Sequence, residues 1–139
     1  MADKIYVGVE AVVKDAFDKK YKSTLPKPMK AAIEKVINSS SKLTTKPAPD
    51  KNTKGFYVTA SLVSMTKDEK SKPPMLAAQA SLAVATWPEM SMFAFAKGSA
   101  KEQLGNPSKI DADVQGLAED LMEDVTKSQV IKTLENKKP

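Results

Sequence analysis

Three segments of alternating apolar residues follow one another through the middle of the chain, with only short polar breaks between them. They span residues 56–65, 75–86 and 90–98. Alternation of this kind is typical of a β-strand that buries one face. The last two segments are joined by the turn Trp87-Pro88-Glu89 and form the clearest hairpin in the chain. The pattern therefore predicts an antiparallel meander with one buried face.

The flanking sequence predicts one more long strand and two helices. Residues 4–14 alternate in the same way. Residues 42–46 are expected to form a short strand, because the chain must return from the first helix to the sheet. Between them, Thr24 is the expected N-cap of a helix whose apolar residues run to Ile37 at helical spacing. A second amphipathic helix begins at about Asp111 and continues toward the carboxyl terminus.

This order of elements predicts a single α+β domain over residues 1–139. We expect a mixed, largely antiparallel sheet of four to five strands with two helices packed on one face. The chain is 41% hydrophobic but only 6% aromatic, so its core must consist mainly of small aliphatic residues and methionine. No segment approaches the ~20 apolar residues of a membrane span.

The chain contains no Cys and no His, and all 22 of its basic residues are Lys. This composition excludes disulfides, thiolate chemistry and His-based triads, and it removes the bidentate arginine contacts that recognise phosphate or guanine. We therefore predict a protein that is not an enzyme and that binds no specific nucleic acid. An alternative enzyme would depend on carboxylates and Lys, and it would need a deep pocket holding at least two acids. Glu10 is the one acid embedded between apolar residues, and we expect it on an open strand face.

Charge is unevenly distributed along the chain. Residues 1–74 carry 15 Lys against 8 acids, whereas residues 75–139 carry 7 Lys against 9 acids. An alternative function is therefore binding of a polyanion or an anionic surface. The lysines concerned cluster at the start of the first helix: Lys19, Lys20, Lys22, Lys27 and Lys30.

Neither metals nor cofactors are predicted. Asp111 and Asp113 resemble the start of a calcium loop, but Met122 occupies the twelfth position, where a bidentate Glu is required. Both aspartates instead suit the first turn of a helix. Methionines on alternate strand positions can ligate Cu(I), but they more often provide adaptable packing or contact surface.

The 87–95 hairpin is the candidate contact surface for another protein. Alternation places Phe93 and Phe95 on one face, and Met90 and Met92 on the other. A partner would bind through the aromatic residues or by strand addition to a free sheet edge. The candidate partner contacts are Trp87, Phe93, Phe95, Met90 and Met92.

The chain also resembles a group of small bacterial envelope domains. The matching segments are KIYVGVEAVV, LPKPMKAAIEKVI, GFYVTASLVSM, MLAAQASLAVAT with MSMFAFAKGSA, and DADVQGLAEDLMEDV. The group includes the amino-terminal domain of the Tol-system propeller protein, the curli-secretion lipoprotein and the outer-membrane activators of penicillin-binding proteins. This chain departs from the lipoproteins in lacking a lipidated Cys. The resemblance implies a non-catalytic protein–protein module, periplasmic or secreted in a mature form without its signal; a cytoplasmic location is the alternative.

Replacement of Trp87 by Ala tests the hairpin as a contact surface. We expect Trp87→Ala to weaken partner binding and to leave the fold intact, because an aromatic residue at a hairpin tip can anchor a partner. Circular dichroism measures the fold and a direct binding assay measures the contact. Wholesale unfolding would instead assign Trp87 to the core.

Overall fold

The computed structural model of this chain describes residues 4–46, 54–70 and 72–137. Its strands form one five-stranded sheet in the order β2-β1-β3-β4-β5. β1 pairs in parallel with both β2 and β3, and the pairs β3–β4 and β4–β5 are antiparallel. The predicted mixed, largely antiparallel sheet is confirmed. The strands are β1 (Ile5–Val13), β2 (Leu43–Thr44), β3 (Gly55–Asp68), β4 (Met75–Trp87) and β5 (Met92–Gln103).

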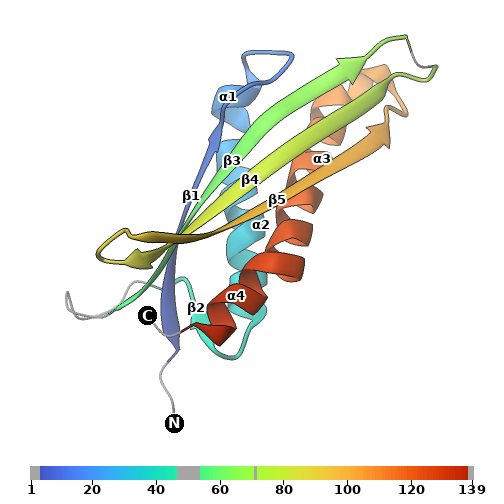
Figure 1. Cartoon of the computed structure of the whole chain (residues 1–139). Coiled ribbons are helices and arrows are strands. Elements are labelled where there is room, and N and C mark those ends of the chain that lie inside the picture. The colour runs from blue at the N-terminus through green and yellow to red at the C-terminus, as the bar shows by residue number, and fades with distance from the viewer. Residues whose placement is uncertain (1–3, 47–53, 71, 138–139) are drawn as a thin grey trace.

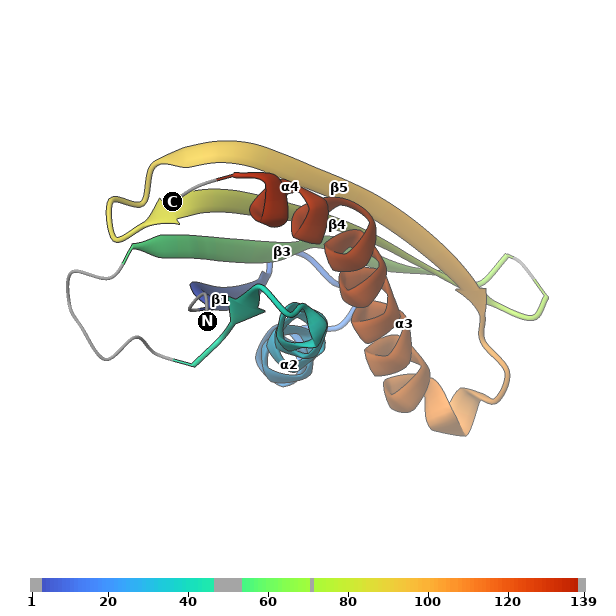
Figure 2. The same ribbon diagram turned by 90° about the horizontal axis from the view of Figure 1, so that it is seen from below.

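Both long helices lie on the same side of this sheet, as predicted. Figure 1 shows them behind the strands, and Figure 2 shows the sheet arched over them. The long helices are α2 (Pro26–Ser39) and α3 (Ile110–Val125), and the shorter pieces are α1 (Tyr21–Thr24), the 3-10 turn η1 (Pro107–Lys109), the π-helical turn η2 (Thr126–Val130) and α4 (Ile131–Asn136). The described part of the chain places no helix on the other face of the sheet.

Alternation along the strands sorts side chains between the two faces. On β4, Leu76, Leu82 and Val84 are buried against the helices, and they join α2 and α3 residues such as Ile33 and Leu121 in one core cluster. Each such side chain contributes roughly 1.5–3 kcal/mol relative to leaving it exposed. The odd-numbered residues of β4 alternate with these and face away from the helices.

The expected N-cap at Thr24 is wrong. A helical turn already begins at Tyr21, and Leu25 occupies the N-cap position of α2 with helical backbone angles. The backbone N–H of Leu25 donates to the carbonyl of Tyr21 at 3.1 Å, and the N–H of Met29 donates to the carbonyl of Leu25 at 3.0 Å. Leu25 is therefore already helical where α2 begins, and Pro26 and Pro28, which carry no N–H, reduce the need for a side-chain cap.

The expectation that Phe93 and Phe95 share a face is also wrong. Val84 pairs with Ala94 but Ala85 pairs with Met92, so Phe93 is an extra, bulged residue. Such a bulge reverses the alternation on one side of it. Phe93 consequently turns to the core, with its ring centroid 5.7 Å from that of Phe56, whereas the side chain of Phe95 is exposed.

α3 approaches β5 closely because β5 carries Gly98 at the contact. A Cβ atom at this position would collide with Cγ2 of Val125 and approach Cδ1 of Leu121. The absent side chain therefore determines how near the helix lies to the strand.

Adding one methyl group at each of two glycines should have opposite effects. Gly98→Ala should lower the free energy of unfolding by roughly 1–3 kcal/mol, because the contact with α3 becomes overpacked. Gly116→Ala should raise it by up to about 1 kcal/mol, because Ala favours a helix interior and the added methyl meets nothing within 4 Å. Urea unfolding measures both variants, and an unchanged midpoint for Gly98→Ala would contradict the close contact.

Candidate interaction surface

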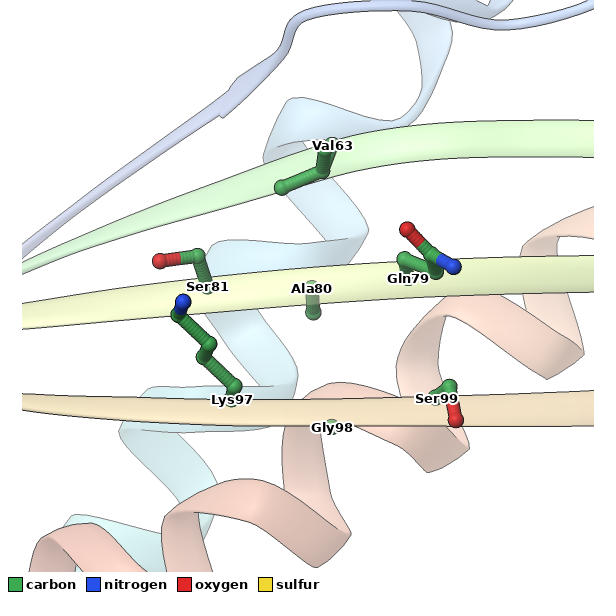
Figure 3. A pocket seen from close by; sticks show the side chains of 7 residues that line it. All are labelled: Val63, Gln79, Ala80, Ser81, Lys97, Gly98 and Ser99. Atoms are coloured by element: carbon green, nitrogen blue, oxygen red, sulfur yellow. The ribbon is translucent and has the colours of Figure 1, made fainter.

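The face of the sheet that points away from the helices has a shallow hollow near its middle. Figure 3 shows the side chains of Gln79, Ser81, Lys97 and Ser99 around it, with the helices behind the strands. The hollow has a volume of about 380 Å³, and Val63 lies at its rim where the β3–β4 register shifts. Its lining is small, polar and open to solvent, and it includes no acidic residue.

A cluster of three aromatic residues occupies one end of this face. The ring of Trp87 stacks on Tyr57 at 5.6 Å and meets Tyr6 edge-on at 6.0 Å. Gly55 pairs with both Tyr6 and Trp87, and a Cβ atom at this position would collide with the backbone carbonyl oxygen of Tyr6. The ring of Tyr57 lies over Gly8. Trp87 is thus half-buried in a cluster, and its two tyrosine partners were not anticipated from the sequence.

The hairpin tip beside this cluster exposes apolar side chains. Met90, Met92 and Phe95 have exposed fractions of 48%, 54% and 63%. Met92 and Phe95 pair with Ala85 and Ala83 of β4, which places them on the open face. We call Met90, Met92 and Phe95 the tip patch.

Backbone hydrogen bonds around Thr86 hold the turn of this hairpin. The N–H of Met90 donates to the carbonyl of Thr86 at 2.8 Å, and the N–H of Thr86 donates to the carbonyl of Ser91 at 3.0 Å. The N–H of Ser91 also donates to Oγ1 of Thr86 at 3.3 Å. The tip patch is therefore presented by an ordered turn.

Met90 is held in a backbone conformation that favours Gly or Asn. Its φ is 59°, the left-handed region, which costs an ordinary L-residue about 1–2 kcal/mol. Its side chain is exposed, so burial does not offset this cost. An apolar side chain on a strained backbone has no explanation in the stability of the fold, and such strain often marks a functional position.

Phe93 lies apart from the tip patch. Its half-buried ring contacts the core, and Nζ of Lys137 lies 4.5 Å from its centroid. Its proposed role as a partner contact stays a prediction.

A polar cluster, separate from the aromatic one, joins the start of α3 to α1. The hydroxyl of Tyr21 donates to Oδ1 of Asp111 at 2.7 Å, and Nζ of Lys20 lies 3.0 Å from the same oxygen. These contacts lower the pKa of Asp111, with the Tyr21 hydrogen bond as the main cause. Burial and the neighbouring carboxylate raise the pKa of Tyr21. Asp111 does lie in the first turn of α3, but it bridges to α1 as well.

The remaining predicted residues are scattered. Glu10 is exposed on the open face, as expected, and Oε2 of Glu10 accepts a hydrogen bond from the Tyr57 hydroxyl at 3.3 Å. Lys20 is paired with Asp111, whereas Lys27 and Lys30 line a groove beside β1.

Within residues 4–46, 54–70 and 72–137, no group of three or more acidic residues is placed to hold a metal ion. None of the described helices is both long and apolar enough to cross a membrane.

Comparison with known proteins shows the fold. No family model and no curated protein matches the chain. A hypothetical protein from Chlamydia trachomatis is 14% identical with a TM-score of 0.67, covering 95% of this chain and 98% of that one. The PelC dodecamer from Paraburkholderia phytofirmans is 8% identical, with a TM-score of 0.58 and coverage of 91% and 89%.

A minor lipoprotein from Acinetobacter baumannii also shares the fold. It is 6% identical with a TM-score of 0.55, covering 94% of this chain and 93% of that one. The structural neighbours are therefore small bacterial domains that include lipoproteins, which agrees with the general class predicted from the sequence. The particular envelope families named there stay a prediction.

The Asp111 cluster makes stability depend on acidity in a defined direction. The pKa of Asp111 in the folded chain lies below its ordinary value of 3.8. The ionised carboxylate of Asp111 therefore adds to the free energy of unfolding at pH values above 3.8. The contribution is lost as the pH falls through the lower, folded pKa. Asp111→Asn should therefore destabilise the protein near neutrality and reduce its further loss of stability in acid.

Urea unfolding between pH 7 and pH 2 measures this effect. Asp113→Asn, in the same helical turn, is the matched control and should keep the acid dependence of the parent. If Asp111→Asn retained it too, the bridge to α1 would contribute nothing to stability.

Proposed function

We propose that this chain is a non-enzymatic interaction or assembly module of the bacterial envelope or an exported protein, acting as one domain. Its tip patch is the contact for another protein. The observation that carries the proposal is the exposure of three apolar side chains on an ordered hairpin, one of them on a strained backbone. Apolar residues presented in this way gain their free energy when a partner removes them from water.

The half-buried aromatic cluster extends this surface. Trp87 and Tyr57 present large, rigid side chains that lose little conformational entropy when a partner binds. The tip patch adds two methionines, whose flexible side chains adapt to a partner's shape. A contact of this composition suits a protein surface better than a small molecule.

The structural neighbours support this class of function. They include a lipoprotein and a protein that assembles as a dodecamer. In an assembly, a neighbouring protein would cover the exposed tip patch. The sequence resemblance implies a location in the envelope. Three of the hollows in the structure are lined by at most one acidic residue each, which favours binding over carboxylate catalysis.

Site-specific crosslinking in the cells that produce the protein tests the proposal. A photoreactive amino acid replaces Phe95, and adducts are resolved by mass. We expect a discrete protein adduct, because the side chain at this position would be covered by the partner. A chain that forms no adduct at this position would contradict the proposal, as would adducts with lipid alone.

Two variants control this experiment. The same photoreactive residue at Asp120, exposed on α3, should give no matching adduct. Met90→Gly removes a patch side chain and relieves the left-handed backbone, so it should weaken the Phe95 adduct without lowering the unfolding midpoint. An undiminished adduct in this variant would place Met90 outside the contact.

A further inference from the structure

β1 becomes an unpaired edge of the sheet after its first residues. β2 pairs only with Ile5 and Tyr6 and supplies no partner beyond them. The N–H of Ile5 donates toward β2, to the carbonyl of Lys42, whereas the N–H of Lys14 donates toward β3. The backbone N–H and C=O groups of successive residues point to opposite sides of a strand. Those of the odd-numbered residues of β1 therefore point away from β3.

The outward backbone groups of Val9, Ala11 and Val13 therefore have no strand partner in the described part of the chain. Each residue offers one N–H donor and one C=O acceptor at the edge. An unpaired strand edge of this kind is a template for another strand.

A groove lies along this edge, between β1 and the start of α2. Its volume is about 410 Å³. The hydroxyl of Tyr57 and the carboxylate of Glu10, which are hydrogen-bonded to each other, lie at its open-face side. The lining consists of Val9, Glu10, Ala11, Pro26, Lys27, Lys30 and Tyr57.

The charge of the groove favours an acidic occupant. Lys27 and Lys30 are exposed and stand three residues apart on α2, so they project from one side of the helix. No ion pair involves either of them in the described part of the chain. Glu10 is the single acid in the lining, and it already accepts a hydrogen bond from Tyr57.

We propose that this groove binds an extended, acidic peptide segment of a partner protein, which adds to β1 as a further strand. Backbone hydrogen bonds to Val9, Ala11 and Val13 provide the pairing, and acidic side chains of the segment meet Lys27 and Lys30. This division of roles is that of strand-addition sites, where the backbone gives affinity and side chains give specificity. The groove is a second surface, and it stands independently of the tip patch.

The opposite edge of the sheet is less suited to strand addition. The side-chain amide of Gln129 donates to the carbonyl of Lys97 at 2.8 Å and so occupies a backbone acceptor of β5. The bulge at Phe93 interrupts the regular pairing geometry of the same strand. Strand addition is therefore favoured at the β1 edge alone.

Titration with two synthetic decapeptides tests the proposal, with amide chemical shifts of the intact protein as the measurement. One peptide alternates Val with Glu, and the other alternates Val with Lys. We expect the Glu peptide to bind saturably and to shift the amides of Val9, Ala11 and Val13, together with those of Lys27 and Lys30. The Lys peptide should cause no saturable change.

Charge reversal in the groove provides the decisive comparison. Lys27→Glu with Lys30→Glu should weaken binding of the Glu peptide about tenfold, as expected for replacing two exposed attractive pairs by repulsive ones. The same variant should gain binding of the Lys peptide. Lys97→Glu with Lys101→Glu, on the β5 edge, is the matched control and should leave the affinity of the Glu peptide within about twofold.

Several outcomes would overturn the inference. They are the absence of saturable shifts, shifts that map to β5 or to the tip patch, and equal binding of the two peptides. A change of the β1 amides with protein concentration alone would assign the edge to a second copy of the chain instead. Phe95→Ser should leave peptide binding unchanged, so a failure of the tip patch and a failure of the groove can be distinguished.

Discussion

Alternate residues of β3 and β4 are buried against α2 and α3, while the residues between them face away from the helices. The two long helices cover only one face, so the sheet can bury only half of its side chains there. Gly98 serves this one-sided packing, because its missing side chain lets α3 approach β5. The open face follows directly from it.

The periodic elements of the fold could be predicted from the sequence, because burial of one face imposes a period on each strand and helix. The long strands and both long helices can be predicted in this way, whereas the short β2 is expected because the chain must return from the first helix to the sheet. The bulge at Phe93 could not be predicted, because local alternation fits Phe93 on either face and the choice depends on packing against Phe56. The bridge from Tyr21 to Asp111 joins residues 90 positions apart, and no local pattern indicates it.

The exposure of the hairpin residues could be predicted only in part, and their role as partner contacts stays a prediction. Met90, Met92 and Phe95 are indeed exposed together, whereas the sequence assigned Phe95 to the opposite face from the methionines. A single extra residue in β5 accounts for the difference, since a shift of one position exchanges the two faces of a strand. The left-handed backbone of Met90 was also beyond prediction, because Gly or Asn is the residue that would have indicated it.

The two proposed surfaces meet at Tyr57, which stacks on Trp87 and also lines the groove beside β1. They nevertheless use different physical forces. The tip patch gains free energy by removing apolar area from water, which salt does not screen, whereas attraction to Lys27 and Lys30 acts between exposed charges. The Debye length falls from about 10 Å at 0.1 M salt to about 3 Å at 1 M. A partner held mainly by the groove should therefore bind more weakly as salt rises, because its charge contacts are screened while its backbone hydrogen bonds remain. A partner held mainly by the patch should keep its affinity.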